Sequence, residues 1–205
     1  MNNETKASLA KAYDADAAKR AAVVPAEWKV QERERFISKL REEGKTAVLE
    51  IGVGTGKDSE YFRSEGFSIT CIDLSEEMVK HCKAKGLDAA VMDFYNLQFP
   101  DRSFDAVYAL NCLLHVPKAE LGQVLDEIKR VMKEDGLLYM GVYGGKDSEE
   151  IWEDDWCEPK RLFSMYTDES VQEAVRVHMD IEYFQTVPLE TGKPHFQSLH
   201  LRKVK

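Results

Sequence analysis

Residues 48–59, VLEIGVGTGKDS, place three glycines within five residues directly after an apolar run. A glycine-rich loop after a strand lets backbone N–H groups approach a ligand closely, as in loops that bind phosphates or dinucleotides. A Walker A loop needs the pattern G-x-x-x-x-G-K-[ST], but here Gly56 and Lys57 are followed by Asp58. Ile51 also occupies the position of the first glycine. An aspartate cannot replace the hydroxyl that binds magnesium and would repel phosphate, so the sequence argues against a nucleoside triphosphate site.

A dinucleotide site is the second possibility for this loop. Its fingerprint is G-x-G-x-x-G/A, and after Gly52 and Gly54 the third position is occupied by Lys57. The small residue that permits close packing of helix on strand is therefore missing, which makes NAD a second choice. The remaining pattern is E-x-G-x-G-x-G, formed by Glu50 and three glycines that end at Gly56.

Two acids follow the next strand-like runs. Asp73 ends the run SITCID, about 20 residues after the first glycine, where an acid can accept hydrogen bonds from both hydroxyls of a ribose. The same residue could instead cap the helix that begins in SEEMVK. Asp93 is followed by Phe94 after the third run, and this pair could bind an adenine amino group and cover the ring. A polar loop with a buried aromatic ring is the equally simple alternative for that pair.

These residues must be positioned by alternating strands and helices. Strand-like runs lie at 46–51, 67–72, 88–92, 104–110 and 137–143, and helix-like segments lie at 58–64, 75–85 and 120–132, the last of which we expect to end at Gly136. Such alternation is typical of βαβ units, with a parallel sheet and helices on both of its faces.

The two ends of the chain differ from this core. Residues 167–175 are expected to form a helix capped by Thr167 or Asp168, followed by strands at 179–187 and 196–204. Their linker, PLETGKPH, is too short for a helical crossover, so the two strands should be antiparallel. Two helical stretches precede the first strand, of which residues 26–43 have an amphipathic pattern. The predicted fold is α/β, a doubly wound, mostly parallel sheet with a C-terminal antiparallel hairpin and N-terminal cap helices.

Composition limits the function classes. The 205 residues suit a single domain, and the formal charge of −9 argues against a nucleic-acid partner. The amino terminus lacks an apolar signal segment and no run approaches the ~18 apolar residues of a membrane span, so we expect a cytoplasmic protein with no membrane partner. The four cysteines form no C-x-x-C and no Cys/His pairing, so no metal site is expected.

The single domain divides into four expected parts: cap helices at 1–44, a cofactor-binding core at 45–143, a substrate-side loop at 144–166, and a C-terminal helix and hairpin at 167–205. Within the loop, residues 146–158 combine seven acids with Trp152 and Trp156. This segment could form a lid that shields the substrate, in which case its charge would favour a cationic one. A solvated surface loop is the alternative.

Four segments resemble the class I S-adenosylmethionine-dependent methyltransferases, particularly their small stand-alone bacterial members. They are VLEIGVGTG, ITCIDLSEEMVKHCK, AVMDFYNLQFPDRSFDAVYALNCLLHVP and VMKEDGLLYMGVY, in the family's order. The resemblance implies a Rossmann-like fold, S-adenosyl-L-methionine as cofactor, S-adenosyl-L-homocysteine as product, and a small-molecule methyl acceptor. The amino-terminal AYDADA is also similar to the family segment whose tyrosine, here Tyr13, approaches the methionine part of the cofactor.

The resemblance assigns further cofactor contacts residue by residue. Gly52 and Gly54 would let the backbone approach the methionyl and ribose portions, Asp73 would bind the ribose hydroxyls, and Leu74 would lie beside the adenine.

Asp93 and Phe94 would hold the edge and the face of the adenine. Asn111, just past the fourth strand, stands where a main-chain oxygen usually receives the cofactor's amino group. Glu50 stands where many members have Asp, and Lys57 could pair with the cofactor carboxylate or be a solvated lysine of the first helical turn.

The implied reaction is in-line attack on a methyl group that is already activated, so it needs no Ser-His-Asp or Cys-His triad, and the sequence shows none. A base matters only if the acceptor arrives protonated. His115, in NCLLHVP, is the first candidate, with a histidine packed at a helix start as its alternative. Tyr143 is the second, with a core tyrosine as its alternative. A non-catalytic cofactor-binding or partner subunit of the same fold, and an NAD-dependent oxidoreductase, are the competing functions.

Overall fold

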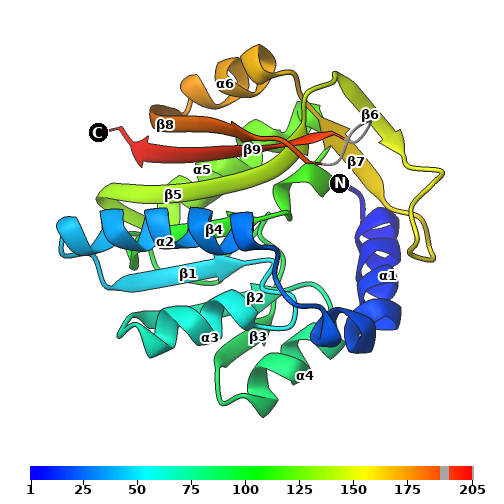
Figure 1. Ribbon diagram of the computed structural model, residues 1–205, viewed down its shortest axis with the longest axis horizontal. Coiled ribbons are helices and arrows are strands. Elements are labelled where there is room, and N and C mark those ends of the chain that lie inside the picture. The colour runs from blue at the N-terminus through cyan, green and yellow to red at the C-terminus, as the bar shows by residue number, and fades with distance from the viewer. Residues whose placement is uncertain (190–193, 205) are drawn as a thin grey trace.

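The computed structural model describes residues 1–189 and 194–204. A seven-stranded sheet has the order β3-β2-β1-β4-β5-β9-β8, and β6 and β7 form a separate two-stranded sheet (Figure 1). The strands are β1 (Ala47–Ile51), β2 (Ser68–Asp73), β3 (Asp88–Val91), β4 (Phe104–Leu110), β5 (Met132–Gly144), β6 (Ser148–Ile151), β7 (Leu162–Met165), β8 (Met179–Val187) and β9 (His195–Lys203). The helices are α1 (Asn3–Ala22), α2 (Glu27–Glu42), α3 (Lys57–Ser64), α4 (Glu76–Ala84), α5 (Leu121–Val131) and α6 (Asp168–Arg176), with short 3-10 turns η1 (Leu113–His115) and η2 (Lys118–Glu120).

The strand directions confirm the predicted fold. The pairs β1–β2, β2–β3, β1–β4 and β4–β5 are parallel, whereas β9 is antiparallel to both β5 and β8. Residues 190–193 of the linker PLETGKPH lie outside the described residues. The strand order reverses between β1 and β4, and ligands of such sheets bind at the carboxyl ends of the strands beside this reversal.

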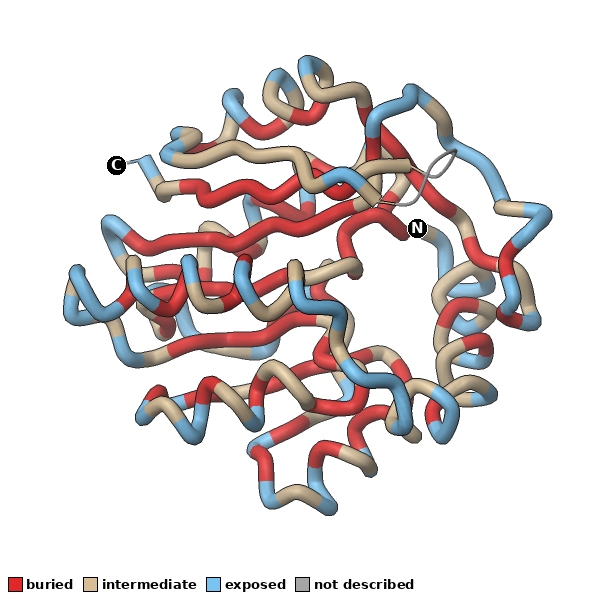
Figure 2. The backbone as a smooth tube through the Cα atoms, viewed as in Figure 1, coloured by how far each residue is buried: buried red, intermediate tan, exposed pale blue. Residues whose placement is uncertain are grey.

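The sheet is buried on both faces. Along β5, Leu138, Met140 and Val142 join the apolar cluster that includes α5 and α6, while Leu137 and Tyr139 join the cluster that includes α2, α3 and α4. Figure 2 shows the central strands buried along their length and the exposed residues on the outer surfaces of the helices. Burial of each apolar side chain of this size contributes about 1.5–3 kcal/mol to the free energy of unfolding. The two clusters therefore stabilise the sheet, and with it the positions of the loops at its carboxyl edge.

Helix caps follow the sequence pattern. Thr167 caps α6 by accepting a hydrogen bond from the backbone N–H of Ser170 at 3.1 Å, which confirms one of the two expected caps. Ser75 caps α4 through the N–H of Met78 at 3.1 Å, so Asp73 is not the cap of that helix.

Two expectations about element boundaries were wrong. The helix expected to reach Gly136 ends at Val131, because Met132 is already extended, fully buried and paired with Phe104 of β4. The register of β5 against β4 shifts between Met132 and Leu137, and Asp135 in this irregular stretch has a φ of 63°.

The segment 144–166, expected to be a loop, contains the β6–β7 hairpin. The acidic run that suggested a solvated loop contains a strand, because residues 148–151 pair antiparallel with residues 162–165. The side chain of Glu149 in this strand accepts hydrogen bonds from the Lys118 N–H at 2.5 Å and from Ser164 Oγ at 3.2 Å.

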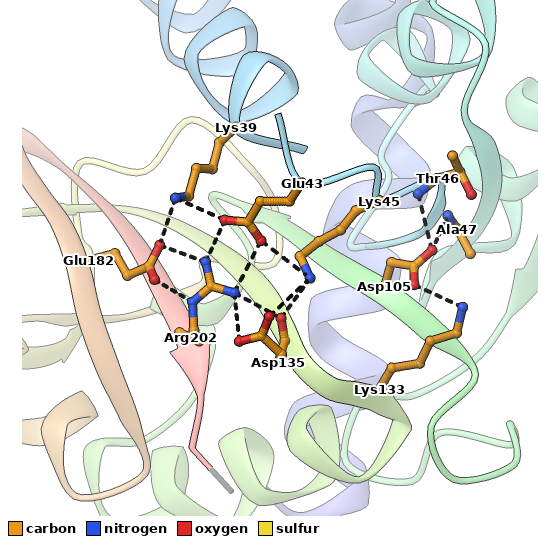
Figure 3. Close-up of polar contacts among 10 residues, drawn as sticks. All are labelled: Lys39, Glu43, Lys45, Thr46, Ala47, Asp105, Lys133, Asp135, Glu182 and Arg202. Atoms are coloured by element: carbon orange, nitrogen blue, oxygen red, sulfur yellow. Dashed lines mark hydrogen bonds and ion pairs between the residues drawn. The ribbon is translucent and has the colours of Figure 1, made fainter. Parts of the chain in front are cut away.

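An ion-pair network joins α2, β5, β8 and β9 at the amino-terminal side of the sheet (Figure 3). The guanidinium of Arg202 lies 2.6 Å from Glu43 and 2.9 Å from Asp135, and it also pairs with Glu182. Lys39 bridges Glu43 at 2.9 Å and Glu182 at 3.4 Å. Burial raises the pKa of Glu43, but hydrogen bonds from Arg202 and Lys39 outweigh it and lower that pKa to about 2.

An Arg202→Leu variant should lose about 1–2 kcal/mol of unfolding free energy at pH 7, on the scale of several partly exposed ion pairs. Glu43 has a lower pKa in the folded chain than its ordinary 4.5. Its stabilising contribution is therefore full above that ordinary value and is lost as the pH falls toward 2. Urea unfolding between pH 7 and pH 2 should show the two proteins converging. An Arg102→Leu control removes one exposed pair with Glu134 and should change little. A stability difference that does not depend on pH would contradict the assignment.

Candidate active site

The loops after β1 and β2 are joined by one carboxylate. Asp73 Oδ2 accepts a hydrogen bond from the Gly54 N–H at 2.8 Å, and its Oδ1 accepts one from the Ser75 N–H at 2.9 Å. Burial raises the pKa of Asp73, although hydrogen bonds from the backbone oppose this shift, and its side chain retains 9% exposure. Each carboxylate oxygen has a further lone pair, so Asp73 can still accept hydrogen bonds from a ligand at this edge.

The three glycines of the loop have different roles. All have positive φ, at 65° for Gly52, 56° for Gly54 and 78° for Gly56. A Cβ on Gly52 would lie 2.4 Å from the Cβ of Cys112, and one on Gly56 would lie 2.7 Å from Leu87. A Cβ on Gly54 would meet nothing within 4 Å. Gly52 and Gly56 therefore allow close packing within the protein, and Gly54 is the glycine of the three with open space beside it.

Asn111 stands at the carboxyl end of β4 with a left-handed backbone, φ 56°, a conformation that asparagine tolerates better than most residues. Its N–H donates to the Gly141 carbonyl at 2.8 Å. Among the described residues, none hydrogen-bonds its buried side-chain Oδ1. A buried oxygen of this kind needs a donor, and the amino group of a ligand would supply one.

Asp93 and Phe94 follow β3 at the same edge. Asp93 Oδ1 accepts the Tyr95 N–H at 3.0 Å, and its Oδ2 pairs with Lys6 of α1 at 2.6 Å. Phe94 is buried and stacks on Tyr95 with 5.6 Å between ring centroids. Leu74, directly after Asp73, is half-buried.

Glu50 and Lys57 have protein partners in this structure. Glu50 is buried and accepts a hydrogen bond from Ser59 Oγ on α3, and burial raises its pKa well above the ordinary value. Lys57 Nζ donates to the carbonyl of Arg20 at 2.7 Å and to that of Val23, at the end of α1. Their expected cofactor contacts remain predictions.

Helix α1 crosses the carboxyl edge and makes polar contacts with the loops after β2, β3 and β4. Besides the Lys6–Asp93 pair, Asp14 accepts hydrogen bonds from Ser75 Oγ at 2.5 Å and from the Glu77 N–H at 3.1 Å. Figure 1 shows α1 beyond the right-hand ends of the strands. We call the polar side chains of this helix that contact other segments the α1 ladder: Lys6, Tyr13, Asp14, Asp16 and Arg20.

His115 lies between α1 and β7. Its Nδ1 is 2.7 Å from the Leu162 carbonyl oxygen, and its Nε2 is 2.8 Å from the Tyr13 hydroxyl. The side chain is 3% exposed, and burial lowers its pKa to about 3, with a smaller contribution from Arg161. Burial also raises the pKa of Tyr13. Of the expected site residues, Tyr13 and His115 are brought into direct contact.

Tyr143 lies one residue before the end of β5. It is half-buried and packs edge-on against Phe196 with 5.9 Å between ring centroids.

The acidic segment is bound to α1. Trp156 Nε1 donates to Asp16 Oδ2 at 3.1 Å, although the Trp156 side chain remains 62% exposed. Trp152 instead packs edge-on against Phe163 at 5.1 Å. Trp156 thus contacts α1 while remaining largely exposed, Trp152 packs on the body of the protein, and the lid remains a prediction.

A buried ion pair holds the turn between β6 and β7. Arg161 donates from Nε and Nη2 to the two carboxylate oxygens of Asp155, at 2.8 and 2.7 Å, and both residues are 5% exposed. The guanidinium carbon of Arg161 also lies 5.0 Å from the Tyr13 ring centroid.

Sequence reasoning did not identify Asp14, Asp16, Arg20 or Arg161 as parts of this region, and it placed Asp155 there only as one of the acids of residues 146–158. Asp14 and Asp16 lie within AYDADA, and Arg20 follows it. The pairing of Asp155 with Arg161 could not be predicted, because it depends on the geometry of one turn.

Within residues 1–189 and 194–204, no group of three or more His, Cys, Asp or Glu side chains is placed to hold a metal ion. In the same part of the chain, no helix combines the length and the apolar character that crossing a bilayer requires.

Comparison with known proteins adds to this geometry. Residues 49–140 match the family model described as a methyltransferase domain. The chain is 33% identical over 124 residues to a sterol 24-C-methyltransferase of Gibberella zeae, covering 56% of this chain and 31% of that protein. It is 37% identical over 108 residues to a phosphatidylethanolamine N-methyltransferase of Cereibacter sphaeroides, covering 49% and 52%. The chain therefore spans about half or less of the length of these curated relatives.

Among solved structures, the Burkholderia thailandensis 1,6-didemethyltoxoflavin-N1-methyltransferase, with bound 1,6-didemethyltoxoflavin and S-adenosylhomocysteine, superposes with a TM-score of 0.77. It is 22% identical, and the match covers 100% of this chain and 91% of that one. This likeness shows a shared fold. The domain match over residues 49–140 and the quoted motifs are in keeping with the resemblance to class I S-adenosylmethionine-dependent methyltransferases.

Proposed function

We propose that this protein transfers the methyl group of S-adenosylmethionine to a small-molecule acceptor by in-line attack. The observation that carries the proposal is the shared carboxyl edge. There Asp73 binds the loop of Gly54, the buried Oδ1 of Asn111 lacks a donor among the described residues, and Tyr13 contacts His115.

The residues at this edge fit the cofactor. Asp73 would accept hydrogen bonds from the ribose hydroxyls, and the space beside Gly54 would admit the chain between ribose and methionine. Asp93 and Phe94 would hold the adenine, with Leu74 beside it. When bound, the cofactor supplies a methyl group already activated by its sulfonium. The protein then needs chiefly to align the acceptor and to exclude water.

Asn111 can serve the cofactor's amino group in two ways. Its main-chain carbonyl was the expected acceptor, and its side-chain Oδ1 is a second, buried one in the same residue. Both would receive hydrogen bonds from an ammonium, and bonds to a charged donor are among the stronger ones.

A small acceptor is supported by what surrounds the edge. Helix α1 and the turn between β6 and β7 are joined by the Trp156–Asp16 hydrogen bond, so two segments outside the sheet meet above it. The structural neighbour that covers the whole chain was solved with a small molecule beside the demethylated cofactor. The curated relatives act on different substrates, which fits a substrate choice made outside the shared core.

Calorimetry should show binding of S-adenosylmethionine and of S-adenosylhomocysteine, and no binding of NAD, because Lys57 occupies the third glycine position of the dinucleotide fingerprint. S-adenosylhomocysteine release from a panel of small metabolites then tests turnover. Heat from NAD alone would overturn the cofactor assignment. Binding of S-adenosylmethionine with no turnover on any acceptor would favour a non-catalytic cofactor-binding protein.

A further inference from the structure

The hydrogen bonds of His115 define its proton positions. A carbonyl oxygen can only accept, so the 2.7 Å contact with Leu162 requires the proton to be on Nδ1. In the neutral ring Nε2 then has the lone pair, which accepts the Tyr13 hydroxyl at 2.8 Å. Both nitrogens of this buried ring are thus engaged by the protein, and the lone pair that a general base would use is already occupied.

The charges around His115 oppose a second proton. The charge of Arg20 acts on the imidazole from α1, and the charges of Arg161 and Asp155 act on it from the turn between β6 and β7. Asp155 would favour an imidazolium, but Arg161 binds both of its carboxylate oxygens. Burial is the largest effect and acts in the same direction as the two arginines, so the pKa of His115 falls to about 3. The ring is neutral throughout the neutral pH range.

Four carboxylates on the segments above the edge are also engaged. Asp14 accepts from Ser75 and the Glu77 N–H, and Asp16 pairs with Arg20 at 2.8 Å and accepts from Trp156. Asp155 is bound by Arg161, and Glu149 accepts from Lys118 and Ser164, as described above.

We propose that His115 is a positioning residue, which joins α1 to β7 through Tyr13 and Leu162, and that the acceptor attacks through an atom with a free lone pair at neutral pH. A heteroaromatic nitrogen and a thiolate have this property. This inference rests on the proposed function. The lone pair forms the bond to the methyl carbon while the carbon–sulfur bond breaks, and that electron pair stays on sulfur as a neutral thioether. A neutral nitrogen becomes a cationic N-methyl product. A thiol that has lost its proton to water attacks as the thiolate and becomes a neutral thioether, so neither acceptor needs a base from the protein.

Nuclear magnetic resonance tests the histidine directly. In protein with ¹⁵N-labelled histidine, long-range ¹H–¹⁵N spectra distinguish the two neutral tautomers from the imidazolium, and a His115→Asn variant identifies the signal. We expect the neutral Nδ1–H pattern without change from pH 5.5 to 9, and a perturbed Nε2 signal in Tyr13→Phe. Titration within this range, or the opposite tautomer, would overturn the positioning role.

Kinetics test the acceptor class. S-adenosylhomocysteine release would be measured with pyridine-, imidazole- and pteridine-type heteroaromatics and alkyl thiols, against phenols, catechols and alcohols of matched size. We expect turnover within the first set. The side-chain amide introduced by His115→Asn would keep a donor for the Leu162 carbonyl. This variant should therefore lower kcat by less than about tenfold and leave the pH profile unchanged, whereas losing a general base costs about 10²–10⁴-fold.

The outcomes separate this inference from the proposed function. Turnover confined to phenols, catechols or alcohols, or loss of an acidic limb of the pH profile in His115→Asn, would overturn the inference and leave methyl transfer standing. A chain that binds no S-adenosylmethionine would overturn the proposed function. Turnover of neither set by a chain that binds S-adenosylmethionine would overturn the proposed acceptor class, and the resonance measurement would then support or overturn the positioning role of His115.

Discussion

An Asp73→Ala variant is expected to bind S-adenosylmethionine about 10- to 150-fold more weakly than the unchanged protein. The loss corresponds to about 1.5–3 kcal/mol, on the scale of hydrogen bonds to a charged group. The substitution removes the proposed acceptor of two ribose hydroxyls and also releases the N–H groups of Gly54 and Ser75. Calorimetry with S-adenosylmethionine gives the dissociation constants.

Two controls make this result specific. Asp73→Asn keeps the size and one acceptor oxygen while removing the charge, so its loss of affinity should be smaller. Glu173→Ala changes an exposed acid on α6 and should leave binding unchanged. Thermal unfolding of each variant reports whether the loops remain folded. An unchanged dissociation constant in a folded Asp73→Ala protein would mean that Asp73 only joins the two loops.

An Asp155→Ala variant should destabilise the turn between β6 and β7 by about 3–5 kcal/mol, because it leaves the Arg161 guanidinium buried without its counter-ion. The effect should be local, since this turn lies outside the seven-stranded sheet. Limited proteolysis after Lys160 and Arg161 should therefore accelerate more than global unfolding by urea does.

The same hairpin supplies a matched control. Lys146 and Glu150 form an ion pair at 3.0 Å whose side chains are 51% and 53% exposed. Such a pair is typically worth less than about 1 kcal/mol, so Glu150→Ala should digest at the original rate. An Asp155→Leu/Arg161→Met double variant removes both charges and should recover much of the lost stability. Equal cleavage of Asp155→Ala and the unchanged protein would show that the buried pair is not what holds the turn.

The sheet was predictable from sequence because its signal is repeated and local. The parallel strands are short apolar runs, and except for the loop between β3 and β4 their connections are helices with an apolar face, so element type and direction follow from periodicity. The predicted helix end at residues 132–136 was wrong because Met132 fits the helical apolar pattern equally well. Only its pairing with Phe104 of β4 makes it extended. The β6 strand was not predicted because its acidic sequence has no alternation of apolar and polar residues, which is the pattern that indicates a strand.

The site was predictable where the glycines and acids stand next to strand ends. Gly54 and Asp73 are in contact as their positions indicated. Sequence could not separate the roles of Gly52 and Gly54, since which glycine faces another residue depends on where Cys112 lies after folding. Nor could it show that Nε2 of His115 is occupied, because the occupying Tyr13 lies on a helix that precedes the whole sheet.

The two amino-terminal helices should differ in local stability, because α2 is held by apolar contacts and α1 mainly by the polar contacts of the α1 ladder. Helix α2 is held by Phe36, Ile37 and Leu40, which are fully buried, and water offers nothing in place of those contacts. Helix α1 buries Leu9, Ala12 and Ala17, and its other contacts are the polar ones of the α1 ladder. When α1 detaches, water can form hydrogen bonds with each of these polar groups. The net free energy by which α1 docks onto the sheet is therefore small relative to the number of its contacts. We therefore expect hydrogen exchange to show α1 as a separate opening unit, which detaches and docks again more often than the sheet unfolds.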